Sequence, residues 1–336
     1  MNLAIVVPYK QFSLYAVALE IYNTLKNRCN VKLYDYEKKD IPQKNILFVG
    51  TPFQETFNYL GRFLPEKRVV FYTSIEGFPV IEPISNELKI ADDITIVANS
   101  LFTKMCLEAV GLTVAGTIPH GVEMTMDYDK KYLKWAETFL KGRPLVLYVT
   151  GNMPRKALDK FMVACKLVKR EMEDVCFILH SGGGYYDVPA LMQLLQINDF
   201  WFTNQFGKLP QRKLNALYKR ATVYVQASYC EGFGVPMIEA FRFFTPVVSV
   251  DAQPYNEIVE DGKTGILVKC RDVKQHLYLE RVYLQYHYYS VDDLADAILY
   301  LIQYEDLRKQ MRKNIAKARL NYDSRRVYPR LIRFFE

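Results

Sequence analysis

The chain has 336 residues, half of them hydrophobic, and a net charge of +7. This length is sufficient for two domains of ordinary size, each with its own core. No run of about 18 apolar residues occurs, so no transmembrane helix is expected. The start, MNLAIVVPYK, lacks the basic segment of a signal peptide. The six cysteines form no CxxC pair, which favours reduced thiols in a cytoplasmic protein.

The positive charge is concentrated in the second part of the chain. Residues 1–142 have equal numbers of basic and acidic side chains, so residues 143–336 supply the whole excess. Segment 308–333 has one acid, Asp323, and many bases: Arg308, Lys309, Arg312, Lys313, Lys317, Arg319, Arg325, Arg326, Arg330 and Arg333. Either this is a solvated helix face with an interdomain contact, or it attracts an anionic membrane surface or acidic acceptor. No nucleic-acid-binding module accompanies it, so nucleic acid is not an expected partner.

Apolar strand-like runs alternate with amphipathic helical stripes along both parts of the chain. The strands are expected at 3–7, 31–36, 46–49, 69–73, 94–98, 145–150, 175–180, 200–206 and 223–227. This rhythm predicts an α/β protein with parallel, doubly wound sheets. A charged helix is expected at 127–141, and the turn Gly142-Arg143-Pro144 after it is the expected domain boundary.

The most informative stretch is 224–267, which contains Glu231 and Glu239 with seven residues between them. Gly232 and Gly234 allow a tight turn after the strand and let a ligand approach the backbone. Pro236 suits the first turn of the helix that follows. The N-terminus of such a helix offers free N–H groups and a partial positive charge, both of which suit a phosphate group.

The E-x7-E spacing, the EGFG turn and the string PVVSVDAQPYNEIVEDGKTGILV resemble the retaining glycosyltransferases of family 4. The resemblance implies the GT-B fold, in which two Rossmann-like domains face each other across a cleft. The string TIPHGV at 117–122 is similar to the segment that ends the N-terminal domain in this family. We therefore expect an acceptor domain at 1–142 and a donor domain at 143–321. A C-terminal helix at about 322–336 is expected to pack back on the first domain.

The same resemblance assigns donor contacts by position in the motif. Glu239 would bind the ribose hydroxyls, and Glu231 would contact the donor sugar. The N–H groups of the turn would line the sugar and the diphosphate, as Gly232, Phe233 and Gly234. A second loop matches the one whose backbone meets the nucleobase, with a plain strand-to-helix connection as its alternative: Gly207, Lys208 and Leu209.

Two adjacent cations, Arg155 and Lys156, lie in the turn after the strand at 145–150. This turn should face the same cleft as the glycine turn, where cations can neutralise a departing diphosphate. The family has an Arg after the glycine at the strand end; here Asn152 follows Gly151, and Arg155 is the candidate substitute. The alternative is an exposed helix start, although basic residues are unfavourable there.

On the N-terminal side, Glu76 follows the fourth strand and is the candidate contact to acceptor or donor sugar, with a simple loop carboxylate as the alternative. His120 lies at the domain junction and is either a donor contact or a structural histidine. The pair Asp127 and Asp129 has the spacing of a metal motif but lies at a helix start. No metal or other cofactor is expected, since the nucleotide diphospho-sugar is a co-substrate.

The resemblance predicts sugar transfer, with retention, from a nucleotide diphospho-sugar to a hydroxyl of a glycan, lipid or protein-linked glycan. A sugar-nucleotide epimerase with the same fold and a catalytically silent binding subunit are the alternatives. The Tyr- and Lys/Arg-rich segment 270–290 is inserted relative to the family pattern. It either contributes to acceptor choice or forms a packed surface hairpin or helix.

Overall fold

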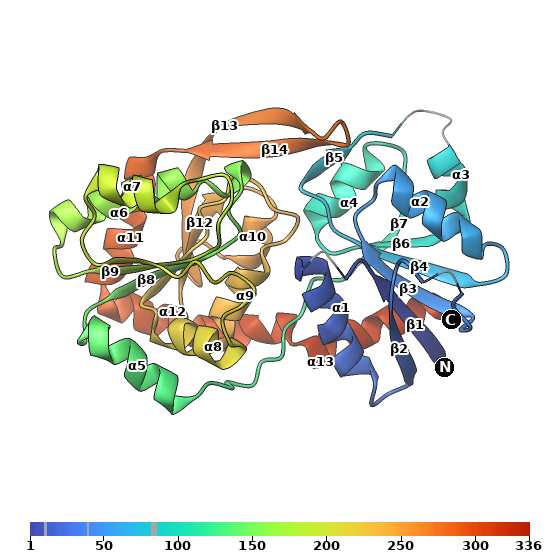
Figure 1. Cartoon of the computed structure of the whole chain (residues 1–336), viewed down its shortest axis with the longest axis horizontal. Helices are drawn as coiled ribbons and strands as arrows, with labels where there is room; N and C mark the ends of the chain where they lie inside the picture. The colour runs from blue at the N-terminus through green and yellow to red at the C-terminus, as the bar shows by residue number, and fades with distance from the viewer. Residues whose placement is uncertain (10–11, 39, 82–85) are drawn as a thin grey trace.

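The computed structural model describes residues 1–9, 12–38, 40–81 and 86–336, which form two α/β domains side by side (Figure 1). The N-terminal domain is built on a parallel six-stranded sheet in the order β2-β1-β3-β4-β6-β7. Its strands are β1 (Asn2–Val7), β2 (Asn30–Asp35), β3 (Asn45–Gly50), β4 (Arg68–Thr73), β6 (Thr95–Ala98) and β7 (Val114–Thr117).

Helices cover both faces of this sheet, which explains why its inner strands are apolar on both sides. Ile21 of α1 belongs to the buried cluster on one face, and Phe57 of α2 belongs to the cluster on the other. Ser100 begins one helix by accepting a hydrogen bond at 2.9 Å from the N–H of Thr103. The helices are α1 (Phe12–Leu25), α2 (Gln54–Leu60), the 3-10 helix η1 (Gly61–Phe63), α3 (Asn86–Asp92) and α4 (Leu101–Glu108).

The C-terminal domain has a second parallel sheet, with the strand order β10-β9-β8-β11-β12-β13. The strand order changes direction between β8 and β11. Its strands are β8 (Leu145–Val149), β9 (Cys176–His180), β10 (Phe200–Phe202), β11 (Val223–Val225), β12 (Val247–Asp251) and β13 (Gly265–Tyr278). Its helices are α5 (Lys130–Leu140), η2 (Pro154–Lys156), α6 (Leu158–Glu171), α7 (Val188–Leu195), α8 (Gln211–Arg220), α9 (Val235–Arg242), α10 (Tyr255–Ile258), α11 (Val291–Gln303) and α12 (Glu305–Ala318).

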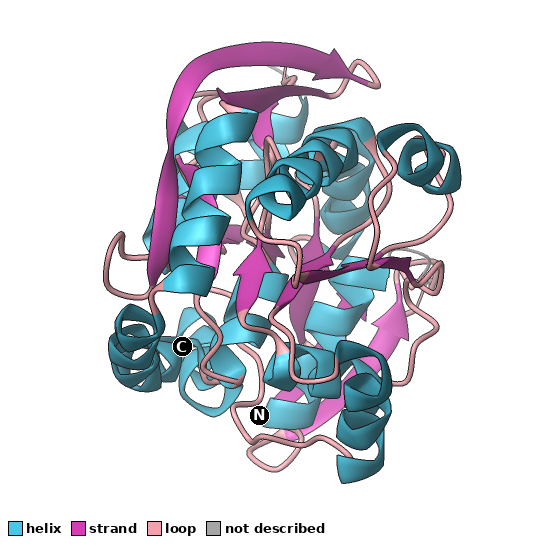
Figure 2. Cartoon of the chain, turned by 90° about the vertical axis from the view of Figure 1, so that its left-hand side faces the viewer, coloured by secondary structure: helices cyan, strands magenta, loops and turns pink. Residues whose placement is uncertain are grey.

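This second sheet extends into the other domain through a long hairpin. Strand β13 continues past its pairing with β12 and returns as β14 (Val282–Tyr289), which pairs antiparallel with β5 (Gly77–Pro79) of the N-terminal domain. The hairpin crosses above the space between the domains in Figure 1, and Figure 2 shows β13 curving over the top of the molecule. Segment 270–290 is therefore a hairpin, but it bridges two domains.

The chain passes between the domains twice on the opposite side (Figure 1). Ile118 belongs to the N-terminal core, and Met124 already belongs to the C-terminal core. Helix α5 packs on α8 and contributes Ala136 and Leu140 to the C-terminal core. The first crossing thus precedes α5 and lies earlier than the boundary predicted near 142. The turn at 142–144 has the composition of a linker, but it joins α5 to β8 within one domain.

The last residues return to the N-terminal domain through η3 (Arg319–Tyr322), α13 (Ser324–Val327) and η4 (Tyr328–Phe335). Tyr328, Leu331 and Phe335 are buried in the cluster that contains α1. A single helix was expected at about 322–336, but this range forms two short pieces after η3, α13 and the 3-10 helix η4. No helix in the described ranges is long and apolar enough to cross a membrane.

The basic segment 308–333 has more partners than its sequence suggested. Lys309 pairs with Glu305 and Asp306 of its own helix. Other bases donate hydrogen bonds to backbone oxygens, as Arg319 does to that of Met124 at 3.2 Å. Part of the positive charge is therefore used inside the chain, and the exposed remainder comprises Arg312, Lys313, Lys317, Arg326, Arg330 and Arg333.

Candidate active site

The candidate site lies where the strand order of the C-terminal sheet changes direction. The turn after β8 brings in Arg155 and Lys156, and the turn after β11 brings in Glu231. Both turns follow the carboxyl ends of neighbouring parallel strands, the usual place for a ligand crevice in an open α/β sheet. A cavity of about 370 Å³ opens there and is also lined from the N-terminal domain, by Glu76 and His120 among others.

Glu231 is the centre of a buried charge cluster. Its Oε1 accepts hydrogen bonds from Lys156 Nζ at 2.5 Å, Ser228 Oγ at 2.8 Å and Gln226 Nε2 at 2.9 Å. Its Oε2 accepts from Arg155 Nη1 at 3.1 Å. Only 9% of Glu231 and 7% of Lys156 is exposed. The carboxylate therefore fixes two cations at the wall of the cavity.

The environment favours the charged forms of Glu231 and Arg155, whereas burial and the neighbouring Arg155 lower the pKa of Lys156. Burial by itself raises the pKa of Glu231, but Lys156 and Arg155 outweigh it and hold the pKa at about 2. Burial opposes the charge of Arg155, yet Glu76 and Glu231 raise its pKa above the ordinary value. Two carboxylates thus balance two cations at this point, so the buried charges are paired within the chain.

Arg155 also joins the two domains. Its Nη2 lies 2.7 Å from Oε1 of Glu76, which is the residue before β5 in the N-terminal domain. The cluster therefore runs from Lys156 through Glu231 and Arg155 to Glu76. The sequence suggested a contact between Glu76 and acceptor or sugar; in the structure, Glu76 lines the cavity and faces the predicted diphosphate-binding arginine.

The glycine turn fits closely against the N-terminal domain. Gly234 has φ +103°, a backbone conformation that other residues rarely adopt, and it precedes helix α9 with Pro236 in the first turn. A Cβ at Gly232 would lie 2.2 Å from Ser74 Oγ. The carbonyl of Gly232 accepts a hydrogen bond from Ser100 Oγ at 3.0 Å. Small residues are thus required here for the domains to meet around the cavity.

His120 lies in the cavity wall, but both of its ring nitrogens have partners. Nδ1 is 2.9 Å from the hydroxyl of Tyr72, and Nε2 is 3.0 Å from Nδ2 of Asn99. Burial lowers the pKa of His120 to about 3, so the ring is neutral near pH 7. Its ring packs edge-on against Phe233 with centroids 5.0 Å apart. His120 can shape the cavity but offers no free nitrogen for proton transfer.

Most of the predicted site residues line this cavity, and a minority do not. Those in the lining are Glu76, His120, Gly151, Arg155, Lys156, Glu231, Gly232, Phe233 and Gly234.

The other predicted residues lie outside the lining. Asn152 is buried and stabilises the neighbouring loop by donating hydrogen bonds to the backbone oxygens of Gly182 and Tyr186. Glu239 lies farther along α9, where it accepts a hydrogen bond from the Tyr218 hydroxyl at 2.8 Å, and burial raises its pKa. The loop Gly207-Lys208-Leu209 lies beside the cavity without being among its lining residues.

The structure adds lining residues that the motif analysis missed. Phe206, just before Gly207, is 43% exposed and lines the cavity. Ser13 and Val17 of α1 line it from the N-terminal domain. The sequence could have indicated Phe206, because an aromatic residue stands directly beside the predicted nucleobase loop. It could not have indicated the α1 residues, because they line the cavity only through the contact between the domains.

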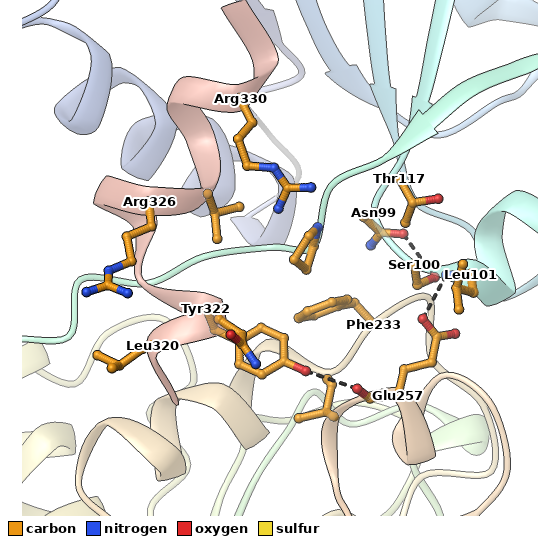
Figure 3. A pocket seen from close by; sticks show the side chains of 14 residues that line it. Asn99, Ser100, Leu101, Thr117, Phe233, Glu257, Leu320, Tyr322, Arg326 and Arg330 are labelled. Atoms are coloured by element: carbon orange, nitrogen blue, oxygen red, sulfur yellow. Dashed lines mark hydrogen bonds between the residues drawn. The ribbon is translucent and has the colours of Figure 1, made fainter. Parts of the chain in front are cut away.

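A larger cavity, of about 540 Å³, also has Phe233 in its lining (Figure 3). It is enclosed by the start of α4, by α10 and by the C-terminal segment, from which Arg330 points inward in Figure 3. Glu257 at its edge accepts hydrogen bonds from the N–H groups of Leu101 and Phe102 at 2.7 and 2.8 Å. Its described lining includes neither Lys156 nor Glu231, so the smaller cavity is the candidate active site.

The structure also shows what the two aspartates of the metal-like motif do. Asp127 pairs with Arg212 at 3.1 Å, and Asp129 caps α5 by accepting from the N–H of Lys131 at 2.8 Å. Among the described residues, no group of three or more His, Cys, Asp and Glu side chains is arranged to hold a metal ion.

The fold and part of the sequence match known proteins. Residues 129–278 match the family model of glycosyl transferases group 1. Over its whole length the chain superposes on HepE from Anabaena, solved in complex with UDP and glucose, with a TM-score of 0.75, 13% identity and coverage of 100% of this chain and 99% of that one. Sucrose-phosphate synthase from Thermosynechococcus elongatus gives a TM-score of 0.75 at 15% identity, covering 100% and 98%.

Two relatives in sequence carry glycosyltransferase names. The first, named uncharacterized glycosyltransferase 335, is from Sulfolobus islandicus rod-shaped virus 1; it is 24% identical over 87% of this chain and 88% of its own length. The second, an N,N'-diacetylbacillosaminyl-diphospho-undecaprenol alpha-1,3-N-acetylgalactosaminyltransferase from Campylobacter jejuni, is 22% identical over 69% of this chain and 54% of its own length. The structural likeness shows that the fold is GT-B, and the likeness in sequence to glycosyl transferases group 1 lies within residues 129–278.

The charge cluster predicts a specific pH dependence of stability. The pKa of Glu231 is about 2 in the folded chain and 4.5 ordinarily, so its stabilising contribution is complete above about pH 4.5 and is lost as the pH falls towards 2. Replacing Glu231 by Gln leaves the buried Lys156 without its carboxylate and Arg155 with Glu76 alone, which should reduce the free energy of unfolding at pH 7 by about 3–5 kcal/mol. This difference from wild type should shrink between pH 4.5 and 2 in urea unfolding experiments.

The exposed Glu66 provides the matched control. Glu66→Gln should change the free energy of unfolding by less than about 0.5 kcal/mol at each pH. A Glu231→Gln difference that stays constant from pH 7 to pH 2.5 would show that Glu231 is not the ionised centre of the cluster.

Proposed function

We propose that the chain is a retaining glycosyltransferase that moves a sugar from a nucleotide diphospho-sugar to a hydroxyl group of an acceptor. The observation that carries this proposal is the pair Arg155 and Lys156, held by Glu231 at the interdomain cavity. Two cations beside a glycine turn suit a diphosphate that gains charge as it leaves the sugar. The solved neighbour HepE was crystallised in complex with UDP and glucose, which supports a nucleotide in this cavity.

The donor would lie along the C-terminal face of the cavity. Its diphosphate would contact Lys156 and Arg155 together with the N–H groups of the glycine turn at the start of α9. Its base would lie towards Phe206, whose exposed ring offers a stacking face. The ribose would then pass near Pro236, and Glu239 beyond it on α9 could reach the hydroxyls only from its free oxygen, since Tyr218 holds the other.

The proposed route retains the anomeric configuration because the diphosphate leaves from the same face of the sugar that the acceptor hydroxyl attacks. A covalent route would require a free carboxylate as nucleophile, whereas Glu231 and Glu76 are both paired with Arg155. Instead, the acceptor oxygen can bond to the anomeric carbon while an oxygen of the departing diphosphate accepts the proton of the acceptor hydroxyl. The bond from the anomeric carbon to the diphosphate breaks in the same step, and the cations neutralise the charge left on the diphosphate.

The acceptor is proposed to be a glycan, a lipid or a protein-linked glycan that enters from the N-terminal domain. Ser13 and Val17 of α1 and Glu76 line that side of the cavity. No metal ion takes part in the proposed step. A cytoplasmic location fits the six free cysteines, and the exposed Arg326, Arg330 and Arg333 could hold the protein to an anionic membrane surface.

Removing one cation tests this proposal. Lys156→Met should weaken UDP binding by about 10- to 150-fold, since a hydrogen bond to a charged group contributes about 1.5–3 kcal/mol. It should also lower the rate of transfer by about 10²–10³-fold through lost stabilisation of the leaving diphosphate. Calorimetry with UDP and release of UDP from UDP-sugars measure the two effects.

Lys131→Met changes an exposed lysine on α5 and is the matched control, with expected wild-type binding and rate. Wild-type turnover in Lys156→Met would refute the assignment of the site. Tight nucleotide binding by the wild type without turnover of any UDP-, GDP- or ADP-sugar, whatever acceptor is offered, would instead favour a silent binding subunit.

Phe206 should recognise the base and not the phosphates. Stacking of a base on an aromatic ring contributes about 1–3 kcal/mol, so Phe206→Ala should raise the Kd of UDP by about 5- to 150-fold. The Kd of inorganic pyrophosphate, which has no base, should stay within twofold of wild type in the same titration. Equal losses for UDP and pyrophosphate would mean that the base lies elsewhere.

A further inference from the structure

The hairpin β13–β14 forms backbone pairing between the two domains immediately after Glu76. Val282, Tyr283 and Leu284 of β14 lie opposite Pro79, Phe78 and Gly77 of β5. Two further hydrogen bonds extend the pairing: the N–H of Val80 donates to Arg281 O at 2.8 Å, and the N–H of Gln285 donates to Glu76 O at 3.3 Å. The pairing therefore begins at the backbone of the residue whose carboxylate holds Arg155.

Apolar side chains seal this junction. A small buried cluster contains Ile75, Phe102 and Cys106 from the N-terminal domain, Cys230 from the C-terminal domain, and Val282 and Leu284 from the hairpin. This cluster is separate from the main cores of the two domains. Residues 271–280 of the hairpin are all exposed, so most of β13 beyond residue 270 adds nothing to the core of its own domain. The apolar contacts of the distal hairpin are thus made with the interdomain junction.

The approach of the two strands leaves no room for a side chain at Gly77. A Cβ built there would lie 2.0 Å from the carbonyl oxygen of Tyr283. The backbone of Glu76 is held on one side by the hairpin, and its carboxylate is held on the other by Arg155 at 2.7 Å. At the base of the hairpin, the N–H of His287 donates to Tyr229 O at 2.9 Å, which fixes β14 to the turn that leads to Glu231.

We propose that the hairpin is a positioning element: it holds Glu76 on Arg155 and keeps the two domains together before any ligand binds. It joins the domains at the edge of the molecule opposite the two chain crossings, as Figure 1 shows. Opening of the domains about those crossings would have to break the β5–β14 pairing and expose the small apolar cluster. The site is therefore assembled in the free protein, and ligand binding does not close it.

A distance measurement between the domains tests this directly. Spin labels are placed at two exposed positions, one in each domain, by Asn27→Cys and Gln193→Cys. Cys29 and Cys270 are replaced by Ser because the other four cysteines are buried. The full chain should give one narrow distance distribution that stays the same when UDP is added. In the test variant, residues 275–285 are replaced by Asn-Gly, a favoured two-residue hairpin turn that joins the paired residues Lys274 and Tyr286.

The shortened variant keeps both domain cores, since residues 275–285 belong to neither. It should give a broad distribution without UDP. Gly77→Val, which blocks the strand pairing, should broaden it as well, whereas Leu277→Ala at an exposed hairpin position should leave it narrow. A wild-type distribution that is broad, or that shifts with UDP, would overturn the proposal. A narrow distribution in the shortened variant would overturn it too.

The effect on catalysis rests on the proposed function and is read separately. The shortened hairpin leaves Lys156 and Glu231 in place within one domain but frees Glu76 from Arg155. We expect kcat for sugar transfer to fall at least tenfold while the Kd of UDP stays within threefold of wild type. Equal kcat would show that the hairpin does not position Glu76. If no form of the protein turns over a nucleotide sugar, the proposed function fails, while the distance measurement still decides the role of the hairpin.

Discussion

A buried carboxylate that holds two cations is the constraint on which the candidate site depends. Moving charged groups out of water costs several kcal/mol each, and a buried pair is tolerated only when its hydrogen bonds are nearly complete. Glu231 meets this condition with four donors, two of which are Lys156 and Arg155. The cations are consequently fixed in position before a ligand arrives. Groups oriented in advance stabilise developing charge without the cost of reorganising at the moment of reaction.

The same cluster explains why the two domains have to meet so closely. Glu231 and Lys156 belong to one domain, but Arg155 has its second carboxylate, Glu76, in the other. Without Glu76 the cluster would have an excess positive charge at a buried position. The close contact of Gly232 with Ser74 and the pairing of β5 with β14 keep Glu76 within reach. The same few residues therefore balance the buried charges of the site and hold the two domains in contact.

The proximity of Arg155 and Lys156 to Glu231 could be predicted from the sequence because it follows from the geometry of parallel strands. Turns after neighbouring parallel strands lie at the same sheet edge, so Arg155 and Lys156 were expected near Glu231. The roles of Asn152 and Glu239 were harder to predict, because hydrogen bonds to Tyr186 and Tyr218 arise only in the folded chain.

The position of the domain boundary and the bridging role of the hairpin could not be predicted from the sequence, for a different reason. The exposed positions of helix α5 include Lys130, Lys131 and Lys134, and its contacts with α8 and with the C-terminal core assign it to the second domain. The pattern at 270–290 was consistent with a hairpin or a helix in a single domain. Pairing of β14 with a three-residue strand about 200 positions earlier in the chain leaves almost no local signal, since so short a strand has no periodicity to detect.

The central claim is that the cations held by Glu231 receive a diphosphate at the junction of the two domains. A crystal structure of the chain with UDP tests it most directly. The claim predicts diphosphate oxygens within hydrogen-bond distance of Lys156 or Arg155 and of an N–H group of the glycine turn. It is contradicted if the diphosphate lies in the larger cavity beside Arg330, or if Lys156 and Arg155 remain bound only to Glu231 and Glu76 while UDP occupies another place.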